Sequence, residues 1–315
     1  MPVFKIHHVT KYQYDRRVKE SINEVKIFPY HCAEQETLQH DLKITGSPEV
    51  QTFEDYWGNK IGTFSFYPDH TEMIIESRLV VRTITPAQFH ADFLSDWDQL
   101  KQEANGKIQL IELASVEPIK SQPEIDRIVR SIFSPENGVA VAVESCSEFI
   151  FKNFQYIKGI TTIETTVDDI IAYKAGVCQD FAHVLLQMLR TLHIPSRYVS
   201  GYICPNKNGM RGEGATHAWV EAWIPNRGWI GIDPTNNVWV KDTHVKLAVG
   251  RTFSDCTPVK GTFKGPARQK LSIHVSIGYE DGQVFEEINN VKMQAQPSLP
   301  DDDLYTENFS VQQQQ

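Results

Sequence analysis

Three side chains in the second half of the chain, Cys178, His217 and Asp233, have the types and the order that nucleophilic acyl transfer requires. A thiol attacks a carbonyl carbon as the thiolate, and a helix N-terminus or a neighbouring imidazolium favours that form. The imidazole in turn needs a carboxylate or an amide that fixes its tautomer. We therefore interpret Cys178 as a nucleophile, His217 as its base and Asp233 as the group that orients the base.

The sequence around each of these residues agrees with the interpretation. A small-residue turn at 175–177 precedes Cys178, and apolar residues then recur at helical spacing as far as Leu192, so Cys178 begins a buried helix. His217 opens a strand after a Gly-rich loop, and Asp233 ends the next strand, directly before a proline. Two adjacent antiparallel strands would place His217 and Asp233 side by side, facing the end of the helix.

The cysteine pattern predicts no other role for these thiols. The five cysteines are scattered and odd in number and include no CxxC pair, which favours neither a disulfide framework nor a zinc site. Cys146 lies on an apolar helical stripe and is interpreted as a core residue. The chain contains neither a DxDxDG loop nor an HExxH pair. We therefore expect no metal site and no cofactor.

The first part of the chain predicts an all-β domain. Residues 1–83 carry β-branched and aromatic residues in partial alternation, which is typical of antiparallel strands in a sandwich or barrel. Gly58 and Asn59 form a hairpin-turn pair within one of these stretches. Residues 84–122 are irregular, and we interpret them as a connecting segment.

The rest of the chain predicts helices followed by strands. Pro123 opens one helical pattern, a second covers 139–154, and the cysteine helix follows. Strand patterns occur at 196–203, 216–224, 228–235 and 271–280. We expect these strands to form an antiparallel sheet packed on the cysteine helix, so the fold class is α+β. The predicted catalytic core covers 123–295, and 296–315 form a flexible polar tail.

Composition and charge limit the partners. The chain has 315 residues, 41% of them hydrophobic, and a formal net charge of −9. A phosphate-binding surface needs clustered Lys and Arg, so we expect no nucleic-acid partner. No apolar stretch has the length of a signal peptide or a membrane span, so we expect no membrane partner and a cytoplasmic location. The sequence does not indicate an oligomeric state.

Several sequence segments resemble the bacterial branch of the transglutaminase-like superfamily, a group of papain-like thiol enzymes. The resembling segments are 174–202, 215–237 and 244–261, with 7–29 and 55–66 near the N-terminus. The resemblance implies a transglutaminase-like core preceded by a β-rich domain. It also assigns Cys178, His217 and Asp233 the roles that the residue types predict.

Residues near Cys178 and His217 have either a structural or a functional role. We take Gln179, Trp219 and Tyr202 as candidate substrate-binding residues, with Trp219 walling the cleft. Asp180 lies in the first helical turn, where a carboxylate favours the helix dipole, so we expect it to cap the helix. His183 projects from a helix packed into the core, and we expect it to be a buried structural histidine.

The predicted chemistry proceeds through a thioester on Cys178. Water as the second nucleophile gives a peptidase or amidase, acting on a peptide, a protein or a small amide, whereas an amine gives a transglutaminase. We favour hydrolysis, because no calcium-loop signature is present and bacterial relatives of this architecture are regarded as cysteine peptidases. The rival from another class is a non-catalytic peptide-binding scaffold.

Overall fold

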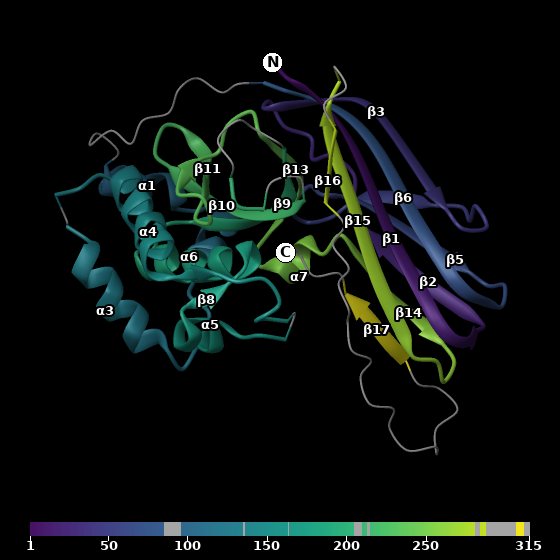
Figure 1. The fold of residues 1–315 in the computed structure, drawn as a ribbon. Coiled ribbons are helices and arrows are strands. Elements are labelled where there is room, and N and C mark those ends of the chain that lie inside the picture. The colour runs from purple at the N-terminus through teal and green to yellow at the C-terminus, as the bar shows by residue number, and fades with distance from the viewer. Residues whose placement is uncertain are drawn as a thin grey trace.

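Figure 1 shows the computed structural model of the chain, in which a helical half with its own sheet lies beside a half made of long strands. The structure describes residues 1–84, 96–134, 136–162, 164–204, 210–212 and 215–280, and the backbone of 284–287 and 307–311. The chain is thus α+β, as the sequence predicts.

The long strands form a sandwich of two antiparallel sheets. The strands of the first sheet are β16 (Val284–Glu287), β15 (Gln269–Tyr279), β1 (Val3–Val18), β6 (His70–Thr83) and β3 (Gln35–Ile44), in that spatial order. Those of the second sheet are β17 (Glu307–Val311), β14 (Val259–Lys264), β2 (Glu20–Val25), β5 (Lys60–Phe66) and β4 (Gln51–Glu54). Gly58 lies in the turn between β4 and β5 with a φ of 79°, which confirms the predicted hairpin.

Alternation of apolar and polar residues decides which faces of these strands are buried. In β1 the side chains of Phe4, Ile6 and Tyr12 point into the sandwich, and in β15 those of Leu271 and Ile273 do the same. Successive strand residues point to opposite faces, so this pattern buries one side of each strand.

The prediction that 271–280 joins the sheet on the cysteine helix is wrong. This segment lies in β15, which pairs with β1 along its whole length, from Phe4 opposite Tyr279 to Tyr14 opposite Gln269. Its alternating pattern fits any half-buried antiparallel strand, and the pattern alone does not name the partner. Of the predicted tail, the structure describes the backbone of β17, which pairs with β14; the rest of 296–315 lies outside the described residues.

The helical half surrounds a third sheet. Its strands are β12 (Val238–Trp239), β11 (Gly228–Asp233), β10 (Thr216–Ile224), β9 (Ser196–Ile203) and β13 (His244–Gly250), in that spatial order. The helices are α1 (Trp97–Ala104), α2 (Ile108–Leu113), α3 (Gln122–Ile132), α4 (Val139–Asn153), α5 (Val167–Tyr173), α6 (Cys178–Thr191) and α7 (Phe253–Cys256). Two short strands, β7 (Gln155–Tyr156) and β8 (Ala175–Gly176), pair in parallel before α6.

Helix α6 is buried between the sheet and the other helices. Phe181 and Leu185 of α6 share one core cluster with Ala218 and Val220 of β10. A helix that is apolar on most of its circumference is stable only in such a position. In the described part of the chain, no helix is both long and apolar enough to cross a membrane.

Two amide side chains join the sandwich to the third sheet. Gln35 donates to the carbonyl of Lys246 and accepts from its N–H, both at 2.8 Å. Asn59 makes the same pair of bonds with Val249, both at 2.7 Å. Both partners lie on β13, so these side chains add to the hydrogen bonds of its main chain, where the Lys246 carbonyl also accepts from the Tyr30 N–H at 2.9 Å.

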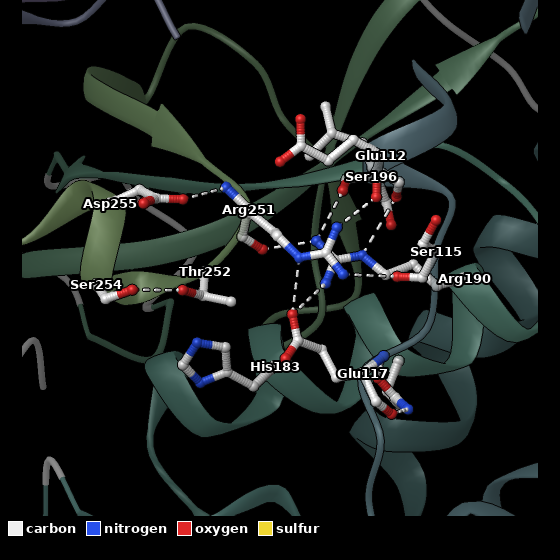
Figure 2. A network of polar contacts seen from close by, with 12 residues as sticks. Glu112, Ser115, Glu117, His183, Arg190, Ser196, Arg251, Thr252, Ser254 and Asp255 are labelled. Atoms are coloured by element: carbon white, nitrogen blue, oxygen red, sulfur yellow. Dashed lines mark hydrogen bonds and ion pairs between the residues drawn. The ribbon is translucent and has the colours of Figure 1, made fainter. Parts of the chain in front are cut away.

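Two arginines, Arg190 and Arg251, fasten the segment 84–122, which connects the two halves, to helix α6, as Figure 2 shows. Arg190 of α6 is 1% exposed and donates to the carbonyls of Leu113, Ser196 and Arg251. Arg251 donates to Glu117 at 2.8 Å. Burial lowers the pKa of Arg190 to about 10, so the side chain stays charged at neutral pH.

Replacing Arg190 by Met should destabilise the fold by about 3 kcal/mol or more, because three carbonyls lose a donor and each unsatisfied buried group costs roughly 1–3 kcal/mol. Chemical denaturation followed by circular dichroism measures the change. Arg127→Met is the control, since the Arg127 side chain is 76% exposed and its loss should cost under about 0.5 kcal/mol. Equal stabilities of the two variants would contradict this role.

Candidate active site

The turn before α6 presents Cys178 as the first residue of the helix. The Asp180 carboxylate folds back over this turn, accepting from the Val177 N–H at 2.8 Å and from the Thr161 hydroxyl at 2.6 Å. This contact confirms that Asp180 caps the helix. A Cβ on Gly176 would lie 2.5 Å from the same carboxylate, so the turn requires glycine there.

His217 and Asp233 meet through the register of β10 and β11. Val220 lies opposite Ile232, so His217 and Asp233 are diagonal neighbours on one face of the sheet. His217 Nε2 lies 2.9 Å from Asp233 Oδ2, and both side chains are fully buried. The structure therefore brings together the base and the carboxylate that the sequence analysis paired.

Asp233 has more partners than His217 alone. Its Oδ1 accepts from the Thr235 N–H at 2.8 Å, and its Oδ2 accepts from the Asn236 side chain at 2.7 Å. His244 of β13 places its Nε2 3.5 Å from the same Oδ2. Together with His217, these donors compensate a carboxylate that has no contact with solvent.

Charge in this cluster favours an imidazolium at His217. Burial alone would lower the pKa of His217, but the charge and hydrogen bond of Asp233, together with the charge of Cys178, outweigh it and raise the pKa to about 10. Burial opposes ionisation of Asp233 too, yet its contacts with His217 hold its pKa well below the usual range. Nε2 is engaged by Asp233, whereas Nδ1 has no hydrogen-bond partner among the described residues.

A glycine packs directly on this ring. Gly212 has a φ of 76°, and a Cβ built on it would lie 3.1 Å from His217 Nδ1. Asn236 holds the preceding residue through its side chain, accepting from the Arg211 N–H at 2.7 Å and donating to the Arg211 carbonyl at 3.2 Å. Asn236 thus connects Asp233 with the segment that covers the base.

The predicted substrate-binding residues occupy three different surroundings. Gln179 is buried next to Cys178 in the first turn of α6. Trp219 is 1% exposed and stacks on His217, with ring centroids 6.4 Å apart. Tyr202 lies in the core of the sandwich, and its hydroxyl is 2.7 Å from Nδ1 of His8. Substrate contact by these residues stays a prediction, and the position of Tyr202 favours a structural role.

His183 makes structural contacts, as expected, but it is half-buried and not buried. Its ring packs against that of Tyr198, with centroids 5.2 Å apart, and its Nε2 accepts from the Phe253 N–H at 3.2 Å. Burial lowers its pKa to about 4, so the imidazole is neutral and suited to accept this bond.

Sequence reasoning missed Gly212, Asn236 and His244. Each lies in a loop or at the start of a strand. Its contact with the His217–Asp233 pair therefore depends on the path of the loops in the folded chain. A signal for Asn236 was present, because it follows Asp233 by three residues in a turn. No comparable local signal marks His244, which is on a strand two positions away from β10 in the sheet.

Two family models match the chain. The model of the transglutaminase-like superfamily core matches residues 126–234, and that of the bacterial transglutaminase-like N-terminal region matches residues 4–82. The first range contains Cys178, His217 and Asp233. The chain belongs to the transglutaminase-like superfamily and carries its bacterial N-terminal region.

Curated relatives share most of the chain. An uncharacterised protein of Mycobacterium leprae is 28% identical over 281 residues, which are 87% of this chain and 97% of that protein. An uncharacterised protein of Mycobacterium tuberculosis is 29% identical over 275 residues, covering 82% and 86% respectively. A protein-glutamine gamma-glutamyltransferase of Pseudomonas aeruginosa is 32% identical over 120 residues, which are 36% of this chain and 18% of that protein.

A solved structure shares the whole fold. A Cytophaga hutchinsonii protein, provisionally described as a cysteine protease, superposes with a TM-score of 0.70 at 22% identity, over 99% of this chain and 98% of that one. At this identity the likeness establishes the architecture, a sandwich beside a transglutaminase-like core, and leaves the reaction to the geometry of the site.

Asp233→Asn should lower the pKa of His217 well below about 10, because burial is then opposed by the charge of Cys178 alone. The imidazolium would therefore lose its proton at a lower pH than in the parent protein. NMR titration of the His217 ring measures the shift, and the exposed Asp98→Asn is the control. An unchanged titration of His217 would contradict the assigned pairing.

Gly212→Ala should slow alkylation of Cys178 at least about 10-fold, since the added methyl group meets the base at His217 Nδ1. Gly106→Ala is the matched control. Gly106 has nearly the same φ, 73°, but a Cβ there meets nothing within 4 Å. Both variants should lose about 1 kcal/mol of stability from backbone strain. Equal alkylation rates would show that Gly212 does not act on the base.

Proposed function

We propose that the chain is a thiol hydrolase, a peptidase or amidase, that works through a Cys178–His217–Asp233 triad. The observation that carries the proposal is the fully buried hydrogen bond between His217 Nε2 and Asp233 Oδ2. It leaves Nδ1 to serve Cys178, whose charge helps raise the pKa of the imidazole.

In the first half of the proposed reaction, the Cys178 thiolate attacks the amide carbonyl carbon and a C–S bond forms. The N–H groups of the first turn of α6 favour the oxyanion, because they lack helical acceptors and lie at the positive end of the helix dipole. His217 Nδ1 then gives its proton to the leaving nitrogen, the C–N bond breaks, and a thioester remains.

In the second half, His217 Nδ1 takes a proton from water as the water oxygen attacks the thioester. The C–S bond breaks, a carboxylic acid leaves, and the Cys178 thiolate and the His217 imidazolium are restored. We favour water as the acceptor because the chain has no calcium-loop signature.

Acyl transfer to an amine is the second candidate, supported by the matching segment of the glutamyltransferase of Pseudomonas aeruginosa. The chemistry as far as the thioester is the same for both reactions, so the acceptor alone distinguishes them. A peptide, a protein or a small amide remains the proposed substrate, and a location in the cytoplasm remains a prediction.

A thiol-directed activity probe tests the nucleophile. Burial raises the pKa of Cys32 to about 11 and that of Cys146 to about 12, and it raises those of Cys204 and Cys256 well above the ordinary value. At neutral pH these four thiols stay protonated, so labelling should depend on Cys178. Cys178→Ala should abolish labelling and Cys32→Ala should leave it unchanged. Absence of specific labelling would instead favour a non-catalytic scaffold.

The acceptor is tested by incubating a library of glutamine-containing peptides with a labelled primary amine. We expect mass spectrometry to show peptide cleavage or release of ammonia that depends on Cys178, without incorporation of the amine. Incorporation that disappears in Cys178→Ala would overturn hydrolysis and establish transamidation.

A further inference from the structure

The ring nitrogens and the carboxylate oxygen at Asp233 also form a cluster of possible metal ligands. Three residues each offer one ligand atom, and these atoms lie within 4.8 Å of one another: His217, Asp233 and His244. All three residues are buried. These residues come from three strands, β10, β11 and β13, at one end of the third sheet. Two imidazoles and a carboxylate form a donor set that zinc and similar transition metals prefer over calcium or magnesium.

The spacing of these atoms suits a small ion. Zinc bonds to nitrogen and oxygen of roughly 2.0–2.2 Å place neighbouring ligands of a tetrahedral site about 3.3–3.5 Å apart. Asp233 Oδ2 lies 2.9 Å from His217 Nε2 and 3.5 Å from His244 Nε2. Side-chain shifts of roughly 1 Å or less would bring these two distances to tetrahedral values, without unpairing a strand.

The surroundings also hold each ligand in position. Thr235 and Asn236 donate to the Asp233 carboxylate, and the Thr243 hydroxyl lies 3.1 Å from His244 Nδ1. Metal-binding carboxylates and imidazoles usually have such partners, which orient the ligand and raise its affinity for the ion.

We propose that His217, Asp233 and His244 form an inhibitory binding site for Zn²⁺ or a similar divalent transition-metal ion. An ion on His217 Nε2 takes the place of the proton that this nitrogen shares with Asp233. It thereby breaks the hydrogen bond with Asp233 that orients the ring, so His217 no longer acts in the triad. The inhibition, unlike the binding itself, rests on the proposed function of the triad.

Binding is tested in the full-length Cys178→Ala variant, which removes the thiol as a competing ligand. We expect one Zn²⁺ per chain in competition with a chromophoric chelator. Adding His244→Gln should weaken Zn²⁺ binding at least about 100-fold. Loss of a residue that only hydrogen-bonds to a ligand lowers metal affinity roughly 10–100-fold, and loss of a ligand itself costs more. Adding His193→Gln, which changes an exposed histidine, should have no effect.

Two results would overturn the site. One is equal affinity with and without His244; the other is loss of binding in Cys178→Ala itself, which would assign the metal to the thiol. Should the His244→Gln variant fail to fold, the absorption spectrum of Co²⁺ bound to Cys178→Ala serves instead. We expect the visible bands of a four-coordinate nitrogen and oxygen site, and a thiolate charge-transfer band would contradict it.

Inhibition is tested separately, by thiol-probe labelling of the wild-type chain. Zn²⁺ should suppress labelling of Cys178, and Mg²⁺ at the same concentration should not. Suppression that persists unchanged in His244→Gln would overturn the inhibitory role. Zn²⁺ binding to a chain that no probe labels would refute the triad while leaving the metal site in place.

Discussion

The buried carboxylate of Asp233 is the constraint on which the site depends. A charge without solvent contact is tolerated only when donors surround it, and here they come from β10, from the turn after β11 and from β13. The ends of three strands therefore have to meet at one carboxylate. That requirement holds the ring of His217 in place, and the same crowding of donors creates the cluster with His244.

The two halves of the molecule support this arrangement jointly. The chain starts in the sandwich, passes through the helical half, and returns to the sandwich with β14 and β15. Gln35 and Asn59 from the sandwich pair with β13, the strand that carries His244. The N-terminal region thus contacts the strand that carries His244.

Local pattern was sufficient where a residue's role depends on its own segment. The apolar spacing after Cys178 predicted a buried helix that starts at this residue, and Asp180 in its first turn predicted the cap. The pairing of His217 with Asp233 could also be predicted, because neighbouring strands joined by a short turn are usually antiparallel. The strand at 271–280 was misplaced because its alternation is the same in either sheet.

The sequence by itself determined the α+β class and the pairing of His217 with Asp233, because both follow from periodicity, turn chemistry and short-range strand order. Only the tertiary structure decided that β15 closes the sandwich, that Gly212 lies on the ring of His217, and that His244 shares Asp233. Those contacts join segments that are far apart in the sequence. Strand order in whole sheets and the choice of buried faces decide whether such segments come together. Side-chain periodicity carries information on burial, and it carries none on the identity of a distant partner.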